Sequence, residues 1–205
     1  MRNIQVFAIG CAILVALGFA AVPAKADTWQ LTESNVDLGV SGNFVSVSIT
    51  VTGDTATFTV TANSSLLNAG SNFGIEKFGF NTSLNNISPC EISLQNGWSV
   101  KTNQQLDGFG SFQFETKGYG YSRMQQLSFS ITDPSINSAA QFYAANSQGY
   151  DFAAEVAGFN STTGQTSAFF SDDPDCHHNV PEPSAMFLVG PCLAGLVVFN
   201  AKLRT

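Results

Sequence analysis

The chain has 205 residues, of which eight are Lys or Arg and 15 are Asp or Glu, for a net charge of −7. This length leaves room for one domain, and the acidic balance argues against nucleic-acid binding through phosphate contacts. The chain also contains 18 Phe residues, which predicts a core rich in aromatic side chains.

The N-terminal residues 1–26 have the pattern of a secretory signal peptide. Arg2 precedes an apolar run from Val6 to Val22, and Ala24 and Ala26 form an A-x-A cleavage site. We therefore expect export and cleavage after Ala26, with an uncleaved signal anchor as the alternative.

Removal of the two ends reveals a much more acidic domain. Only four basic residues lie between residues 27 and 182, whereas all 15 acidic residues lie there, so this span carries a net charge of −11. Such a domain is expected to be soluble and to attract cations rather than anions.

Alternation of apolar and polar residues predicts a hairpin in the first half of the domain. Apolar residues alternate with Ser or Thr over 45–52 and again over 55–62, with Gly53 and Asp54 between the two runs. Period-two alternation is typical of strands, and a Gly-Asp pair suits a tight turn. The outward face of this hairpin is a ladder of hydroxyls, which is either a platform for a glycan or a solvated strand face.

Further short strands are expected along the domain, separated by Gly, Asn and Ser. They cover Trp29–Glu33, Phe73–Phe80, Ile87–Leu94, Trp98–Thr102, Phe109–Glu115, Leu127–Thr132, Tyr150–Phe159 and Ser167–Phe170. Asp133-Pro134-Ser135 is expected to begin one short helix that includes Ala139 to Ala145. This spacing predicts an all-β fold over 27–171, a single β-sandwich that is jelly-roll-like or Ig-like.

Two chemistries are weighed for this domain beyond a structural role. Glu76, Glu91, Glu115 and Glu155 are the glutamates from which a glycosidase would draw its pair of carboxylates. Exposed aromatic side chains would instead bind sugar rings, and the candidates are Trp29, Trp98, Tyr119 and Tyr121. We expect no catalytic residue and no cofactor, because no other arrangement of nucleophile and base or phosphate-binding loop is present.

Residues 172–180 are expected to form a polar acidic linker. Three Asp residues, one Cys and two adjacent His occur there, but neither the ligand spacing of a zinc site nor that of a calcium loop is met, so no metal site is expected. Cys90 and Cys176 are the two cysteines of the exported part, and an oxidising compartment favours a disulfide between them. Two separate thiols are the alternative.

The C-terminal residues 181–205 read as a membrane-insertion signal. An apolar span covers about 185–201, and Lys202 and Arg204 follow it. At about 1.5 Å per residue the span reaches roughly 25 Å, close to the ~30 Å of a hydrocarbon core. The basic flank predicts that the C-terminus lies in the cytoplasm and the domain outside.

A proline-rich motif precedes this span and consists of Val180, Pro181, Glu182, Pro183 and Ser184. Motif, single apolar span and basic end together resemble the PEP-CTERM sorting domain. The resemblance implies recognition and removal of the tail by exosortase, a membrane enzyme of Gram-negative bacteria, and an association with extracellular polysaccharide and biofilm. The alternative is an ordinary C-terminal anchor.

The sequence thus predicts an exported surface or extracellular-matrix protein with a structural or adhesive role. Its expected partners are the export machinery, exosortase and, before processing, the membrane. A carbohydrate-binding module for extracellular polysaccharide is the alternative function, and a glycoside-processing enzyme is the less favoured one.

Overall fold

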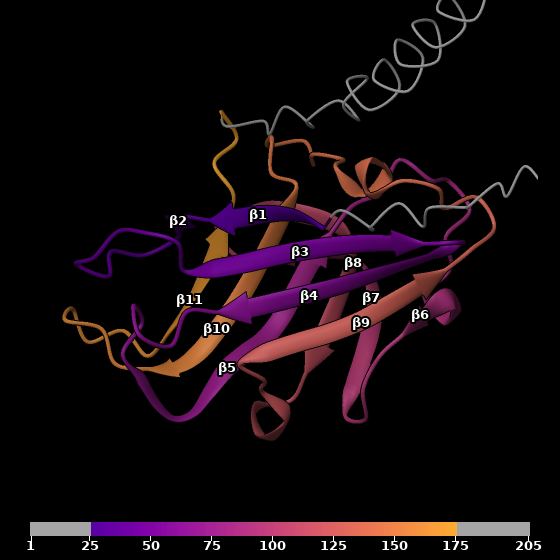
Figure 1. Ribbon diagram of the computed structural model, residues 1–205. Helices are drawn as coiled ribbons and strands as arrows, with labels where there is room; N and C mark the ends of the chain where they lie inside the picture. The colour runs from indigo at the N-terminus through magenta and orange to yellow at the C-terminus, as the bar shows by residue number, and fades with distance from the viewer. Residues whose placement is uncertain (1–25, 176–205) are drawn as a thin grey trace, which may run out of the picture.

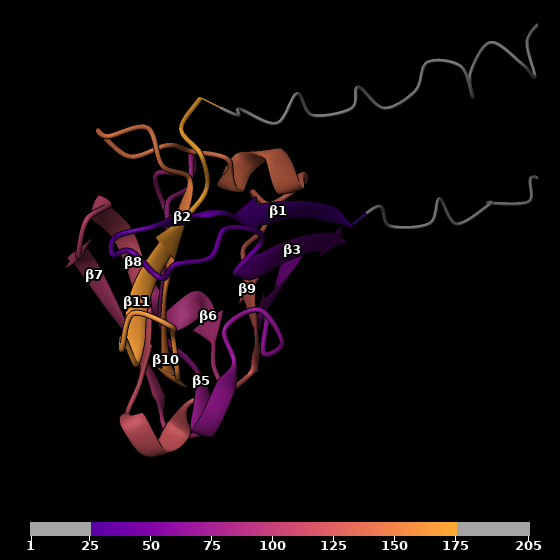
Figure 2. The ribbon, with the colours of Figure 1, turned by 90° about the vertical axis from the view of Figure 1, so that its left-hand side faces the viewer.

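The computed structural model describes residues 26–175, which form two antiparallel β-sheets packed face to face (Figures 1 and 2). The first, here sheet A, has the order β1 (Asp27–Leu31), β3 (Val45–Thr52), β4 (Thr55–Ala62), β9 (Gln126–Thr132) and β6 (Ile92–Ser93). The second, sheet B, has the order β2 (Glu33–Ser34), β11 (Ser167–Ser171), β10 (Phe152–Phe159), β5 (Ala69–Phe80), β8 (Gly110–Gly118) and β7 (Trp98–Leu106). The predicted all-β sandwich is confirmed.

The β3–β4 hairpin forms as its alternation predicts. All eight residue pairs of the two strands are in register, from Val45 opposite Ala62 to Thr52 opposite Thr55. Gly53 adopts a φ of +61° at the turn, a left-handed conformation that glycine reaches without steric cost. The apolar residues of both strands face sheet B and are buried, except Val51, which is partly buried, whereas the Ser and Thr residues face outward.

Aromatic rings fill the space between the two sheets, as the Phe content predicts. Phe58 on β4 is fully buried and stacks on Phe129 of β9, with ring centroids 4.7 Å apart and planes at 9°. Its ring also meets Phe80 of β5 and Phe142, with centroids 5.2 Å away in each case. Phe58 therefore joins strands of both sheets through ring contacts.

Several strands differ in extent from those expected. β5 begins at Ala69 rather than Phe73, and β7 continues to Leu106 rather than Thr102. The expected strand Ile87–Leu94 is replaced by a 3-10 turn, η1 (Pro89–Glu91), and only the two residues of β6 after it form a strand. The expected first strand is divided into β1 and β2, which belong to different sheets.

The predicted helix is wrong in extent and in type. Only Ala139–Phe142 is helical, as a single 3-10 turn, η3. Asp133 does not begin it; its carboxylate instead accepts hydrogen bonds from the backbone N–H and the hydroxyl of Ser135. Ser138 caps η3, and the side chain of Gln141 accepts from the Ser138 backbone N–H in return. Such a short segment has no α-helical stability of its own, so packing of Phe142 in the core decides its shape.

β7 is an edge strand of sheet B, with β8 on one side only. The exposed Lys101 lies near its middle, and Asn103 has a φ of +52° that interrupts the regular strand. Charged side chains and local irregularities are the usual protection of an exposed strand edge against pairing with other chains.

Candidate functional site: an exposed pair of tyrosines

Two neighbouring aromatic side chains stand out on the surface of the sandwich. Tyr119 is 58% exposed and Tyr121 is 83% exposed, which makes them the most exposed large apolar side chains among residues 26–175. Their rings are nearly parallel, with planes at 9° and centroids 5.8 Å apart. Large side chains are seldom exposed in this way unless they contact another molecule, so the pair is the best candidate for a binding site.

The pair lies where the chain passes from sheet B to sheet A, in the connection between β8 and β9. Tyr119 is followed by the 3-10 turn η2 (Gly120–Ser122), seen at the lower edge of the sandwich in Figure 1. The backbone N–H of Ser122 donates to the carbonyl of Tyr119 over 2.6 Å and closes this turn. The turn separates the two tyrosines by one residue and brings both rings to the same side.

Side chains from other strands hold the turn in place. Asn72 at β5 donates through Nδ2 to the carbonyl of Gly120 over 2.6 Å. The indole Nε1 of Trp98 on β7 donates to the carbonyl of Ser122 over 3.0 Å. A binding surface that is ordered beforehand loses less conformational entropy when a ligand arrives.

Gly118 makes the packing of Trp98 against this connection possible. A Cβ atom at residue 118 would lie 2.8 Å from the indole ring of Trp98, which no side chain can accept without displacing the ring. Gly118 therefore has a structural role, because it leaves room for the Trp98 ring beside this connection.

Charge beside the tyrosine pair is internally balanced. Arg123, directly after η2, forms a salt bridge with Glu76 of β5, with both Nε and an η nitrogen 2.7 Å from the same carboxylate oxygen. Each side chain is about one-fifth exposed. This ion pair adds no net charge next to the tyrosine pair.

The structure brings together only two of the four aromatic residues considered as sugar-binding candidates. Trp29 is 3% exposed and packs against Tyr143, with ring centroids 4.1 Å apart. Trp98 is half-buried and holds η2 through the hydrogen bond from its indole Nε1 to the carbonyl of Ser122. Trp29 therefore belongs to the core, a correction to its candidacy, and Trp98 is a positioning residue for the tyrosine pair.

Three of the four glutamates considered for catalysis have structural partners. Glu76 is paired with Arg123, and Glu91 accepts the Ser88 backbone N–H over 2.6 Å in the cap of η1. Glu155 on β10 forms a salt bridge of 2.7 Å with Lys77 of β5. These contacts account for three of the carboxylates without reference to a substrate.

Glu115 on β8 is the fourth, and it is 4% exposed on the outer side of sheet B. Burial raises the pKa of its carboxyl, while the positive charges of Lys77, Lys117 and Lys101 oppose that rise. Glu115 is thus a buried acid surrounded by lysines of β5, β8 and β7, and its raised pKa bears on stability.

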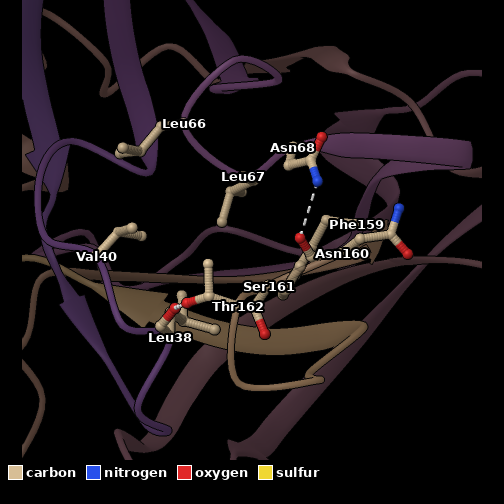
Figure 3. A pocket seen from close by; sticks show the side chains of 9 residues that line it. All are labelled: Leu38, Val40, Leu66, Leu67, Asn68, Phe159, Asn160, Ser161 and Thr162. Carbon is tan, nitrogen blue, oxygen red and sulfur yellow. Dashed lines mark hydrogen bonds between the residues drawn. The ribbon is translucent and has the colours of Figure 1, made fainter.

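A small hollow of about 80 Å³ lies between the segments 38–40, 66–68 and 159–162 (Figure 3). Leu38, Val40, Leu66 and Leu67 form its apolar wall, and residues 159–162 close it. Typical ligand sites span about 300–1,000 Å³. The hollow is too small for a sugar ring of a polymer, so we assign it no ligand.

The expected linker begins later than the sequence indicates, because Asp172 is 7% exposed. Its carboxylate accepts the backbone N–H groups of Phe152 and Asp151, at 2.9 and 3.2 Å. Burial raises the pKa of Asp172, and these two hydrogen bonds oppose the rise. Within the described range 26–175, no group of three or more His, Cys, Asp or Glu side chains is arranged to hold a metal ion.

Cys90 lies in η1 and is exposed, with its sulfur 3.0 Å from the hydroxyl oxygen of Ser88. Cys176 lies outside the described residues, so the disulfide between the two remains a prediction. The same holds for the cleavage site at Ala24 and Ala26, for the motif Val180 to Ser184 and for the flank of Lys202 and Arg204. Among the described residues, no helix has the length and apolar character needed to cross a membrane.

Comparison with known proteins gives no relative for this chain. No family model matches it, and no curated protein and no solved structure matches it either.

Proposed function

We propose that this chain is an exported surface protein whose sandwich domain binds or adheres outside the cell and does not catalyse a reaction. The signal-peptide pattern before Asp27 and the acidic domain that follows support export. The motif Val180 to Ser184, the apolar span over 185–201 and the basic end support sorting by exosortase. In this proposal the C-terminal apolar span is inserted in the inner membrane as an intermediate, and the mature domain reaches the cell surface or the extracellular matrix.

The arrangement of the domain is consistent with display from a C-terminal attachment. The ribbon that follows β11 leaves the sandwich at its upper end in both views, whereas η2 lies at the lower end (Figures 1 and 2). The segment with the tyrosine pair would therefore lie at the far end of the sandwich from an attachment at the C-terminal end.

One observation favours a carbohydrate-binding role for the displayed domain, namely the exposed, parallel rings of Tyr119 and Tyr121. The faces of a tyrosine ring pack against the C–H groups of a sugar ring, and the phenolic hydroxyl remains free to hydrogen-bond. A sugar polymer is also the class of extracellular ligand that a shallow surface can bind repeatedly through many displayed copies. We infer a lectin-like function for extracellular polysaccharide.

Sorting is tested by intact-mass spectrometry of the mature protein isolated from its own host. We expect a mass that lacks residues 1–26 and the residues after the Pro-Glu-Pro motif. The double variant Pro181→Ala/Pro183→Ala should retain the tail and accumulate in the membrane fraction. A mature wild-type protein that ends at Thr205 would favour a plain anchor.

Glycan binding is tested by native electrophoresis of the full chain in a sugar-free detergent, through gels that contain a dissolved polysaccharide. We expect retardation of the wild type and at least tenfold weaker binding of Tyr119→Ala/Tyr121→Ala, because the two rings provide the contact area. Tyr119→Phe/Tyr121→Phe keeps the rings and should retain most of the affinity. Val40→Ala, which truncates an exposed apolar side chain elsewhere, is the matched control.

A further inference from the structure

The outer face of sheet A carries an uncharged lattice of hydroxyl and amide side chains, here called the hydroxyl face. It is built from alternate residues of all five strands of that sheet, which point away from the core. Its members are Thr28, Gln30, Ser46, Ser48, Thr50, Thr52, Thr55, Thr57, Thr59, Thr61, Ser93, Gln126, Ser128, Ser130 and Thr132. The inner residues of these strands form the core, whereas the outer residues are left at the surface and can contact another molecule.

The strand register arranges these side chains in straight rows across the sheet. One row runs Thr28, Ser48, Thr59 and Ser128, from β1 to β9. The row below it runs Gln30, Ser46, Thr61 and Gln126. Adjacent strands are ~4.8 Å apart and alternate residues along a strand ~6.8 Å apart, so the face presents polar groups at regular intervals in two directions.

No member of the hydroxyl face is charged, although the exported part of the chain carries 15 acidic and four basic residues. Solvated protein surfaces ordinarily carry charges on about 25–35% of their residues. All four basic residues of the domain lie elsewhere, on β5, β7 and β8 of sheet B and directly after η2. Both signs of charge are therefore kept off the hydroxyl face.

The centre of the hydroxyl face is available for intermolecular hydrogen bonds. At its margins, Thr55 bonds to Thr132 and the amide of Gln126 donates to Thr61. Within the described residues, the hydroxyls of Ser48, Thr50, Thr57, Thr59 and Ser130 have no hydrogen-bond partner in the protein. Ser and Thr side chains are short, so holding them in place for a ligand costs little conformational entropy.

The chemistry of the hydroxyl face argues against other occupants. Four rows on four strands cover roughly 500 Å², whereas a stable interface with a second copy needs about 800 Å² from each partner. The face has no aromatic or Arg side chain to act as an anchor for a protein partner. It also lacks the apolar and basic residues with which a protein surface binds a membrane.

The hydroxyl face is close to the tyrosine pair along the chain. Tyr121 precedes Gln126, the first residue of β9, by five positions, so the two lie within about 17 Å of each other. Both surfaces are without net charge, and the acidic domain around them would repel an anionic polymer. An uncharged polymer rich in hydroxyl groups satisfies these conditions.

We propose that the hydroxyl face is a contact surface for an extended, uncharged polysaccharide, which it binds in continuation of the tyrosine pair. This inference rests on the proposed glycan-binding function and names its ligand class. Sugar rings stack on Tyr119 and Tyr121, and the hydroxyls of the following sugar units exchange hydrogen bonds with the rows of Ser and Thr. Each contact is weak, and binding becomes strong through many displayed copies on one polymer.

The test measures retardation of the full chain, in sugar-free detergent, in native gels that contain galactomannan, xyloglucan or the anionic polymer alginate. Thr57→Lys/Thr59→Lys places charge at the centre of the face, and Thr57→Val/Thr59→Val removes two hydroxyls with little change in shape. We expect the Lys variant to bind the uncharged polymers at least tenfold more weakly and the Val variant roughly threefold to tenfold more weakly. Thr102→Lys, on the exposed edge strand β7, adds one of the same charges outside the face and should bind like the wild type.

The outcomes separate this inference from the proposed function. If both face variants melt like the wild type and bind galactomannan and xyloglucan like Thr102→Lys, while Tyr119→Ala/Tyr121→Ala loses binding, the hydroxyl face is not a contact surface and the tyrosine site stands. Stronger retardation by alginate than by the uncharged polymers overturns the ligand class. A wild type that no gel retards overturns both.

Discussion

Truncation of Phe58 is the sharpest test of how the sandwich is held together. Phe58 is fully buried on β4, which lies between β3 and β9 and has little freedom to move inward. Its ring contacts Phe129, Phe80 and Phe142, so Phe58→Ala removes ring contacts from both sheets and from η3 at once. A Phe-to-Ala change in a core that cannot collapse costs about 3–5 kcal/mol.

The expected cost is a large part of the total, because domains of this kind have unfolding free energies of about 5–15 kcal/mol. For a domain of this size, each kcal/mol lowers the melting temperature by about 2–4 °C. We therefore expect Phe58→Ala to melt about 6–20 °C below the wild type.

The assay is urea denaturation of the full chain, followed by tryptophan fluorescence and by circular dichroism, with thermal melts in parallel. Phe58→Leu keeps most of the side-chain volume and should lower the free energy of unfolding by less than half as much as Phe58→Ala. Tyr121→Ala, on the surface, should lie within about 0.5 kcal/mol of the wild type. If Phe58→Ala lowers the free energy of unfolding by less than about 2 kcal/mol, and the slope of that free energy against urea concentration is unchanged, a core centred on this ring is refuted.

Three further predictions concern backbone, charge and cysteine. Gly158 has a φ of +80°, and a Cβ there would lie 2.4 Å from the carbonyl oxygen of Asn72. Gly164 has a similar φ of +85° but open space around it. In a urea titration, Gly158→Ala should therefore lower the free energy of unfolding clearly more than Gly164→Ala does. Because burial raises the pKa of Glu115 above its ordinary value of 4.5, the folded state retains the proton better than the unfolded state, and this carboxyl's contribution to stability falls as pH rises through the raised pKa. The stability of Glu115→Gln relative to the wild type, measured as the free energy of unfolding, should accordingly be greater at about pH 7 than at about pH 4. The same difference between the two proteins at both pH values would contradict a raised pKa of Glu115. If the predicted disulfide forms, Cys90 of the exported protein resists alkylation until a reductant is added, and Cys90→Ser lowers the unfolding free energy by up to about 4–5 kcal/mol; alkylation without reductant would show that the thiol is free.

The parts of the fold that could be predicted are those with one buried and one solvated face. The β3–β4 hairpin has strict alternation and a glycine turn, and its register follows from these alone. The start of β5 and the end of β7 could not be predicted in this way, because Ala69 to Asn72 and Lys101 to Gln105 are polar or small on both faces. Pairing with neighbouring strands, which are distant in sequence, extends them.

The candidate site could be predicted only in part, for a related reason. The spacing of Tyr119 and Tyr121 between glycines indicates a turn, but no pattern distinguishes an exposed ring from a buried one in such a short segment. Trp29 illustrates the difficulty, since it lies in a strand that starts the domain and its ring packs on Tyr143 rather than facing solvent. Asn72 and Trp98, which fix the turn from other strands, are visible only once the chain is folded.

The protected edge of sheet B has a consequence for a protein that is crowded with copies of itself. Many identical sandwiches held side by side at one surface would meet edge to edge at high local concentration. Lys101 would oppose the same lysine of a neighbour, and the kink at Asn103 would spoil the straight backbone that a growing fibril requires. If the domain is displayed as proposed, such an edge would favour dense packing as separate molecules, each with its proposed binding surface accessible.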